Sequence, residues 1–193
     1  MQRYIALLGR FTVWDYAAEN RAFLGKLGIA TSALLPICHF DGLTRIPVVD
    51  NKDIEILFIG SLNERRRNML VRMRDAGIGV VCLLNKYGAE RDGVVARAKI
   101  MLNMHFHAAR IFEAVRVSYY LANGLCVLSE GNGDEALEAE WGAGVCFAPY
   151  QDLLPMAQRL LADDALRAQF GTRGLDLMRR RPIAPALAAA LAA

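Results

Sequence analysis

An arginine-rich segment that follows a glycine is the part of this sequence best suited to bind an anion. Gly60 ends a short apolar run, and residues 64–67 place three guanidinium groups at the predicted start of a helix. A helix start presents free N–H groups and a positive dipole end, and arginine matches phosphate oxygens in bidentate geometry. Gly60, Ser61, Arg65 and Arg66 are therefore candidate phosphate-binding residues; the alternative is a solvated arginine face. The dinucleotide and P-loop glycine fingerprints do not occur in the sequence.

A second group of polar residues comprises His105, His107, Arg110 and Glu113. Arg110 and Glu113 are three residues apart and would share one face of a helix predicted over 108–122. A carboxylate there can accept both hydroxyls of a ribose, although on spacing alone an ordinary surface ion pair is the preferred interpretation. His105 and His107 alternate on an extended segment and predict a polar pocket lining. A metal pair would need a third ligand, and none lies at a suitable spacing, so we expect no metal.

Short apolar runs alternate with longer amphipathic segments from residue 54 onward, which predicts a parallel sheet with helices on both faces. The first of these helices is predicted to start with Ser61 as N-cap and Glu64 completing a capping box, and to end at a left-handed Gly77. The predicted strands are 54–59, 79–84, 99–104, 125–129 and 144–147, and the predicted helices are 62–76, 88–98, 108–122, 135–141, 153–162 and 164–179.

This pattern predicts an α/β, Rossmann-like domain over residues 54–180. Ligands of open parallel sheets bind beyond the carboxyl ends of the strands, where both polar groups described above fall. Residues 1–53 form a separate segment, with a helix predicted over 17–27 followed by a linker. Residues 181–193 form an alanine-rich tail.

The composition excludes several classes of protein. The chain has 193 residues, a hydrophobic fraction of 54% and a formal net charge of +3, which argues against intrinsic disorder and against nucleic-acid binding. The sequence holds no apolar stretch long enough for a transmembrane segment and no signal-peptide core, so a cytoplasmic location is expected. Its four cysteines are widely spaced, which predicts reduced, buried thiols.

Several segments together carry a family resemblance. They read LFIGSLNERR at 57–66, YGAERD at 87–92, AKIMLN at 98–103, RIFEA at 110–114 and ANG at 122–124. The stretch 54–171 resembles the C-terminal, nucleotide-sugar-binding domain of GT-B glycosyltransferases. The closest likeness is to the bacterial group related to spore maturation protein CgeB and to glycosyl transferase family 1. The segment VWDY at 13–16 is similar to the end of the other GT-B domain, before the interdomain linker.

The resemblance implies roles for the residues singled out above. Glu113 matches the glutamate that hydrogen-bonds the donor ribose, and Arg110 lies in the donor cleft. Arg65 or Arg66 falls where a basic residue contacts the diphosphate, and Gly60 with Ser61 matches the loop after the first strand. His105 stands where retaining members often carry the first glutamate of a Glu-x7-Glu pattern. The catalytic base normally comes from the other domain, so no catalytic residue is assigned.

The function implied by this resemblance is metal-independent transfer of a hexose from a nucleoside-diphosphate sugar to an unknown acceptor. The length suits one GT-B half plus a short remnant of the other, so the alternative is a non-catalytic nucleotide-binding or interaction module. A third interpretation, a GT-B-like epimerase, would rely on Glu113 and Glu130 as acid and base. The expected partners are a nucleotide sugar, an acceptor, and either a second copy of the chain or a separate acceptor-domain protein.

Overall fold

The computed structural model describes residues 2–106 and 112–192. By its internal contacts the chain divides into two compact units. One is Met1–Phe40 with Arg181–Ala193, and the other is Asp41–Arg180. His107 and Arg110 lie outside the described residues.

The larger unit is built on a five-stranded sheet in the order β4-β3-β5-β6-β7, and all neighbouring strands pair in parallel. Its strands are β3 (Ile54–Ile59), β4 (Val80–Leu83), β5 (Ala98–Asn103), β6 (Val127–Glu130) and β7 (Val145–Ala148). In register, Phe58 of β3 lies opposite Cys82 of β4 on one side and Leu102 of β5 on the other. The predicted Rossmann-like parallel sheet is confirmed.

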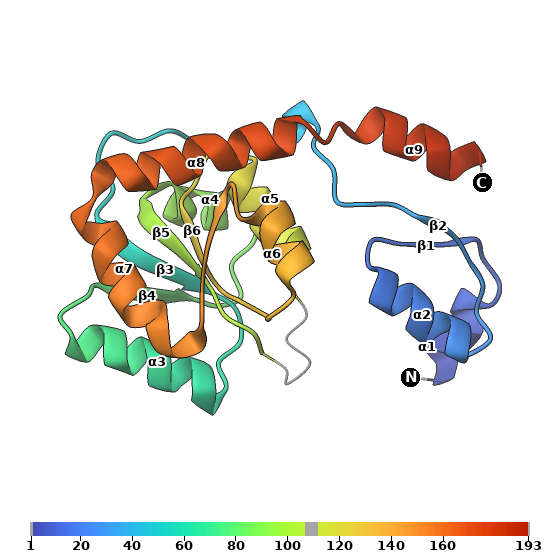
Figure 1. Cartoon of the computed structure of the whole chain (residues 1–193), viewed down its shortest axis with the longest axis horizontal. Coiled ribbons are helices and arrows are strands. Elements are labelled where there is room, and N and C mark those ends of the chain that lie inside the picture. The colour runs from blue at the N-terminus through green and yellow to red at the C-terminus, as the bar shows by residue number, and fades with distance from the viewer. Residues whose placement is uncertain (1, 107–111, 193) are drawn as a thin grey trace. The chain divides into compact units, whose positions relative to one another are not determined.

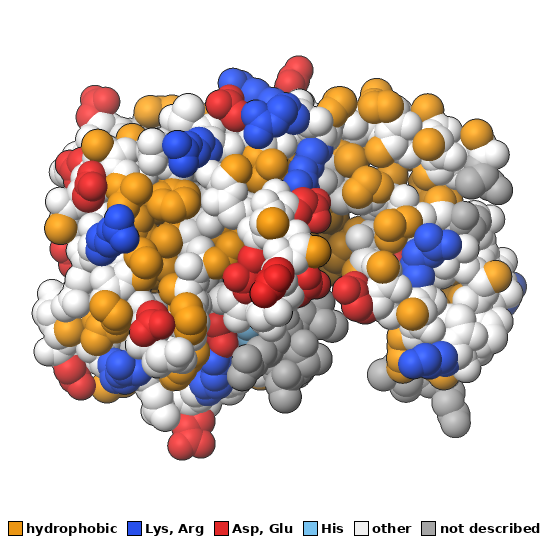
Figure 2. Space-filling view, in the orientation of Figure 1, with side chains coloured by type: hydrophobic (Ala, Val, Ile, Leu, Met, Phe, Trp, Pro, Cys, Tyr) orange, Lys and Arg blue, Asp and Glu red, His pale blue; other side chains and the backbone are white. Residues whose placement is uncertain are grey.

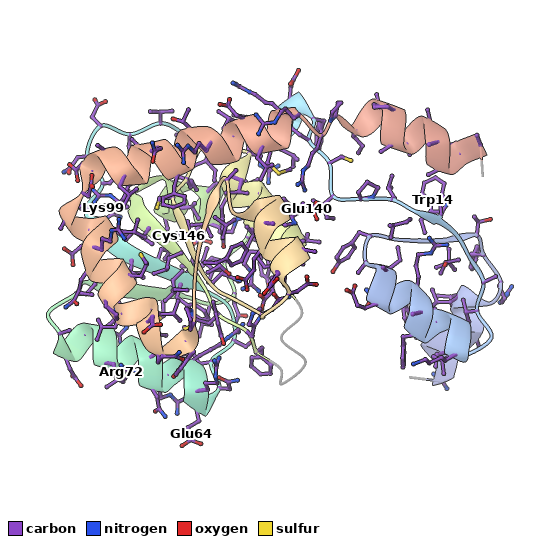
Figure 3. The ribbon with its side chains drawn as sticks, viewed as in Figure 1. Trp14, Glu64, Arg72, Lys99, Glu140 and Cys146 are labelled. Carbon is purple, nitrogen blue, oxygen red and sulfur yellow. The ribbon has the colours of Figure 1, made fainter. Side chains whose placement is uncertain are left out.

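Helices cover both faces of this sheet (Figure 1). They are α3 (Glu64–Asp75), α4 (Gly88–Ala96), α5 (Ala114–Leu121), α6 (Glu135–Trp141), α7 (Leu153–Ala162) and α8 (Asp164–Arg179). Because successive strand residues point to opposite faces, Ile56 and Phe58 pack with α3 and α7, while Leu57 packs with α5 and α8. Cys146, visible among the core side chains in Figure 3, belongs to the layer beneath α7.

Two helix starts differ from those expected. Helix α3 begins at Glu64 with Asn63 as N-cap, whose side chain accepts from the Arg66 backbone N–H at 2.9 Å. The prediction of Ser61 as cap is wrong because the chain is still turning away from β3 there. Helix α5 begins at Ala114, so the predicted start at residue 108 is wrong: the residue before Ala114 is the N-cap and is not helical.

The sequence pattern predicts four buried thiols; this is confirmed for Cys126 and Cys146 and is wrong for Cys38 and Cys82, which are only partly buried. All four cysteines are free, and burial raises the pKa of the Cys126 thiol to about 12. Gly77 and Gly124, which follow α3 and α5, have φ of 83° and 66°. These values lie in the left-handed region that glycine adopts without strain.

Helix α8 approaches the backbone of its neighbours through glycines. A Cβ placed on Gly171 would lie 2.3 Å from the carbonyl oxygen of Gly124, which follows α5. A Cβ on Gly144, just before β7, would lie 2.4 Å from the Cα of Gly174. Both approaches are backbone against backbone, so the absence of a side chain at these glycines permits the close packing of α8.

The loop that enters the larger unit is held by one side chain. Asn123 Oδ1 accepts from the backbone N–H groups of Arg45 and Ile46, both at 2.8 Å. Its Nδ2 donates to the carbonyl oxygens of Leu43 at 2.9 Å and Tyr119 at 2.8 Å. Asn123 therefore fastens residues 43–46 to the end of α5, ahead of β3.

The smaller unit contains α1 (Gln2–Leu8), β1 (Val13–Asp15), α2 (Ala18–Lys26), β2 (Thr31–Leu34) and α9 (Ile183–Ala192). Strands β1 and β2 pair in parallel, and Val13, Leu24 and Ile29 form the buried cluster beside them. The helix predicted over 17–27 is confirmed as α2. Among the described residues of the whole chain, no helix combines the length and apolar character needed to cross a membrane.

Candidate functional site

The strand order creates a switch point between β3 and β5. From β3 the chain crosses to β4 on one side, and from β5 it continues to β6 on the other. The two connections therefore leave the sheet in opposite directions and open a crevice at the carboxyl ends of these strands, where ligands of such folds bind. Gly60 and Ser61 follow β3 at this crevice, and Met104 and His105 follow β5.

The carboxylate of Glu113 lies at the centre of the polar groups at this crevice. Its Oε1 accepts from Arg66 Nη2 at 3.3 Å, and its Oε2 accepts from Asn103 Nδ2 at 3.0 Å. The Nδ1 atom of His105 lies 3.5 Å from the same Oε2. With 22% of its side chain exposed, Glu113 is held by these buried partners and is still accessible to solvent.

These contacts also set the ionisation of Glu113. Burial alone would raise the pKa of the carboxyl, but the nearby imidazole of His105, the hydrogen bond from Asn103 and the charge of Arg116 outweigh it. The net effect is a pKa below the usual value, so the group is a carboxylate at neutral pH and acts as a hydrogen-bond acceptor.

Arg66 is enclosed within the protein. Only 2% of the residue is exposed, and it donates to the carbonyl oxygens of Ser61, at 2.8 Å, and Met104. Its guanidinium also lies 5.1 Å from the ring centre of Phe106 and 5.2 Å from that of Phe58. Burial lowers the pKa of this guanidinium, although the carboxylate of Glu113 partly offsets that effect. Arg66 thus ties the ends of β3 and β5 together.

Arg65 points to a different partner. Its guanidinium forms a bidentate ion pair with Glu130, in which Nη1 lies 2.7 Å from Oε2, and Glu130 is only 1% exposed. The same guanidinium stacks 3.8 Å from the ring centre of Tyr150. The hydrogen bond to Glu130 raises the pKa of Arg65. Glu130 Oε2 also accepts from the backbone N–H of His105 at 3.1 Å, so this pair braces the end of β5.

Buried polar atoms without a partner gather at the same crevice. Among the described residues, six buried side-chain nitrogen or oxygen atoms have no hydrogen-bond partner, and five of them belong to residues of this site. These five are Arg66 Nε, Asn103 Oδ1, His105 Nδ1, His105 Nε2 and Arg116 Nη1. Because native proteins satisfy nearly all buried polar groups, such a concentration marks a place where a ligand or ordered water completes the bonding.

Two cavities flank the ion pair of Arg65 and Glu130. One, of about 420 Å³, lies at the start of α3 and is lined by Asn63, Glu64, Arg65, Asn68 and Tyr150. The other, of about 350 Å³, lies at the ends of β6 and β7 and is lined by Glu130, Gly131, Gly133, Glu138, Phe147, Ala148, Pro149, Tyr150 and Gln151. Tyr150 lines both cavities, and its hydroxyl donates to the Arg65 carbonyl oxygen at 2.7 Å.

The rim of the second cavity is acidic. Asp134 is the N-cap of α6, and Glu138 Oε1 accepts from the Gly133 backbone N–H at 3.1 Å. Figure 2 shows acidic side chains gathered around α6, and Figure 3 shows Glu64 projecting outward from the start of α3. Negative charge at the rim leaves the basic groups near Glu113 as the part of the site suited to an anion.

Comparisons with known proteins place this arrangement in context. No protein-family model matches the chain. Two uncharacterised proteins of Acanthamoeba polyphaga mimivirus are similar in sequence. Protein L140 is 24% identical over 166 residues, which cover 81% of this chain and 53% of that protein. Protein L137 is 30% identical over 122 residues, which cover 60% of this chain and 16% of that protein. The chain thus spans about half or less of these relatives.

Solved structures match over nearly the whole chain. HepE of Anabaena, solved in complex with UDP and glucose, matches with a TM-score of 0.68 and 12% identity, covering 100% of this chain and 66% of its own. TarM matches with a TM-score of 0.64 and 9% identity, covering 99% of this chain and 45% of its own. Sucrose-phosphate synthase of Thermosynechococcus elongatus matches with a TM-score of 0.61 and 17% identity, covering 99% of this chain and 59% of its own. All three are GT-B glycosyltransferases.

The chain has the fold of one half of a GT-B glycosyltransferase. The GT-B resemblance predicted from the sequence is therefore confirmed at the level of the fold, while the narrower likeness to the CgeB-related group stays a prediction. The site described above lies in this GT-B half, at the carboxyl edge of its parallel sheet.

The GT-B half brings together most of the residues predicted from its sequence. Gly60, Ser61, Arg66, His105 and Glu113 converge at the switch point, and Arg65 lies beside them in its pair with Glu130. His107 and Arg110 fall outside the described residues, so their predicted places in the donor cleft are untested. Within the described ranges, no three His, Cys, Asp or Glu side chains gather as a metal site would require.

Sequence reasoning missed several residues of the GT-B site. Asn103 and Ser129, both fully buried, join through Asn103 Nδ2 and Ser129 Oγ at 3.0 Å, and Asn103 also holds Glu113. The available signal was a polar residue at the end of an apolar run: Asn103 is the last residue of β5, and Ser129 is the last but one of β6. Arg116 was also missed, because the predicted helix over 108–122 places it in the middle; in α5, which starts at Ala114, it lies in the first turn, where an arginine opposes the helix dipole.

The lowered pKa of Glu113 predicts a specific pH dependence of stability. A carboxyl whose folded-state pKa is depressed contributes stability above its unfolded value, and that contribution disappears as the pH falls through the folded value. We expect the difference in unfolding free energy between wild type and Glu113→Gln to be constant near neutral pH and to shrink below pH 4.5. Urea denaturation between pH 6 and about pH 3.5 measures it. A difference that grows on acidification would contradict the assignment.

Proposed function

We propose that the larger unit binds a nucleoside-diphosphate sugar and serves as the donor-binding half of a glycosyltransferase. In this proposal the carboxylate of Glu113 accepts hydrogen bonds from the ribose hydroxyls, and the diphosphate lies over Gly60 and Ser61. His107 and Arg110, from the sequence prediction, belong to the same cleft. Arg65 and Arg66 act chiefly by shaping the site, since each is already bonded within the protein.

The observation that carries this proposal is the set of unpartnered polar atoms around a fixed carboxylate at a GT-B switch point. A ribose diol offers two donors and two acceptors. The carboxylate of Glu113 and Asn103 Oδ1 can accept from it, and a ring N–H of His105 can donate to it. Such a ligand would satisfy groups that are otherwise costly to bury. The complex of HepE with UDP and glucose supports the choice of ligand class by its likeness in fold.

Sugar transfer itself would rest on electrostatics. As the bond between sugar and diphosphate breaks, negative charge develops on the leaving group, and prearranged cations and N–H groups stabilise it. This route requires no bound metal. The chain spans 45% to 66% of the three solved structures compared, so transfer, the acceptor, the catalytic base and any oligomer belong to the proposal. A cytoplasmic location stays a prediction.

Binding calorimetry tests the donor site directly. We expect one of UDP, GDP or ADP to bind wild type, and Glu113→Gln to weaken that binding about 10- to 100-fold, because a hydrogen bond to a charged group contributes about 1.5–3 kcal/mol. The matched control is Asp53→Asn, which also turns a carboxylate into an amide. It breaks an exposed ion pair between Asp53, just before β3, and Arg97, just before β5, at the edge of the sheet opposite the site. That control should leave affinity unchanged.

Three outcomes distinguish the possibilities. If no nucleoside diphosphate binds wild type at millimolar concentration, the donor-site proposal fails. If a nucleotide binds, a transfer assay with its sugars and simple acceptors separates a transferase from the module that binds without transferring. Equal weakening by Glu113→Gln and Asp53→Asn would show that Glu113 acts through folding and does not contact the nucleotide.

A further inference from the structure

At this crevice, the Nη1 atom of the Arg116 guanidinium is buried and has no hydrogen-bond partner among the residues that the structure describes. Arg116 lies three residues after Glu113, in the first turn of α5. We infer that Arg116 is the residue that binds the diphosphate of the nucleotide, with a phosphate oxygen seated over Gly60. This inference rests on the proposed function and assigns to α5 a contact that the sequence pattern places on α3.

The geometry around Gly60 provides room for such an anion. A Cβ on Gly60 would lie 3.5 Å from Arg116 Nη1, 3.6 Å from Arg116 Nη2 and 3.6 Å from Arg66 Nη1. Three guanidinium nitrogens thus surround the position that any larger residue would occupy with carbon. Gly60 also has φ of 140°, a conformation that other residues rarely adopt. The glycine keeps this position open to a ligand atom.

The bonding of the three arginines separates their roles. Arg65 is committed to Glu130, and Arg66 donates to two backbone carbonyl oxygens and to Glu113. Arg66 Nε and Arg116 Nη1 are both buried without a hydrogen-bond partner among the described residues, but the guanidinium of Arg66 is already held by three acceptors. A buried guanidinium N–H without an acceptor is costly, and a phosphate oxygen is the ligand that a guanidinium fork fits best.

The charges nearby point the same way. Arg66 and Arg116 bring two positive charges to Gly60, and their mutual repulsion helps to lower the pKa of Arg66. Glu113 supplies one negative charge against these two. Arg116 further lies at the positive end of α5, where a cation is destabilised. A bound anion would relieve both repulsions, which explains why an arginine is placed in so unfavourable a position.

In this arrangement, two side chains at the start of α5 contact different parts of the nucleotide. Glu113, the N-cap of α5, would accept from the ribose, and Arg116, one turn further along, would hold the diphosphate. The nucleoside and the diphosphate therefore depend on different side chains of the same short segment. Substitutions at the two positions should accordingly change the affinity for different parts of the ligand.

The test compares ligands that carry a diphosphate with ligands that lack it. Calorimetry would use the nucleoside diphosphate that binds best among UDP, GDP and ADP, its parent nucleoside, and inorganic pyrophosphate. We expect Arg116→Gln to weaken both diphosphate ligands about 10- to 100-fold, since a charge-assisted hydrogen bond is lost, while nucleoside affinity changes less than about twofold. Arg116→Lys should retain part of the affinity, because it keeps the charge without the fork.

Arg72→Gln is the matched control, since Arg72 is an exposed arginine on α3, labelled in Figure 3. It should not change any of these affinities. Thermal unfolding gives a second readout: Arg116→Gln should melt at the same temperature as wild type or higher, because it removes a charge that Arg66 repels and a buried N–H that has no acceptor among the described residues. A lower melting temperature with unchanged diphosphate affinity would show a structural role and overturn the inference.

The failure of this inference can be told from the failure of the proposed function. If wild type and Arg116→Gln bind the nucleoside diphosphate equally, the inference is overturned while the donor site stands. If no nucleotide binds but pyrophosphate binds wild type and not Arg116→Gln, the anion site stands without the donor-site function. If neither a nucleotide nor pyrophosphate binds wild type, both are overturned.

Discussion

Gly171→Ala should destabilise the larger unit by about 3 kcal/mol, the upper end of the range for overpacking, although alanine favours helices. The added Cβ would lie 2.3 Å from the Gly124 carbonyl oxygen, which is a backbone atom, and the Cβ itself is attached directly to the backbone of α8. No flexible side chain can move aside, so α8 must shift against the turn that follows α5. For a domain of this size we expect the melting temperature to fall by about 6–12 °C.

Gly93→Ala is the control for this substitution. Gly93 is also a helical glycine, in α4, but a Cβ there would have nothing within 4 Å. The gain in helix propensity should be similar at both positions, about 0.5–1 kcal/mol, so Gly93→Ala should raise stability slightly. The difference between the two variants then isolates the clash. A Gly171→Ala protein as stable as Gly93→Ala would contradict the close packing of α8.

The order and type of the elements could be predicted from the sequence because local patterns determine them. Helices α7 and α8 have the predicted bounds, since apolar spacing and an aspartate before α8 define both ends. The start of α3 was harder, because Ser61 and Asn63 both suit an N-cap and only the path of the chain after β3 selects Asn63. The glycines of α8 could not be interpreted from the sequence, where glycine only lowers helix propensity. Their role follows from the backbone of neighbouring segments, which leaves no room for a Cβ.

The location of the site could be predicted from the sequence, but the hydrogen-bond partners of its residues could not. Strand ends in a parallel sheet meet at one edge, so Gly60, His105 and Glu113 could be grouped from the sequence alone. Which arginine pairs with which acceptor depends on contacts between residues far apart, such as Arg65 with Glu130. Three adjacent arginines look equivalent in a sequence. The fold gives Arg65 and Arg66 internal partners, while the buried Nη1 of Arg116, on another helix, has no partner among the described residues.

Arg66→Met should be the most damaging substitution at the site. Methionine can replace the apolar stem between Phe58 and Phe106, but it removes the donors to Ser61 O, Met104 O and Glu113. Loss of one member of a buried ion pair costs about 3–5 kcal/mol, because the remaining charge and carbonyl groups stay buried. Urea denaturation should show this loss, and nucleotide binding should weaken, since Glu113 loses its guanidinium partner and is held by Asn103 and His105 alone. Arg72→Met, exposed on the same helix, should change stability by less than about 0.5 kcal/mol.

A double-mutant cycle would show that the loss passes through Glu113. In the wild-type background, Glu113→Gln removes the charge that Arg66 faces at 3.3 Å and so destabilises the protein. In the Arg66→Met background, the half-buried carboxylate has lost that guanidinium, so Glu113→Gln should be neutral or stabilising. We expect a coupling energy of about 1–3 kcal/mol, within the range for residues that share one network. Strictly additive effects would mean that Arg66 stabilises only the backbone carbonyls, and Glu113 would then owe its position to Asn103 and His105.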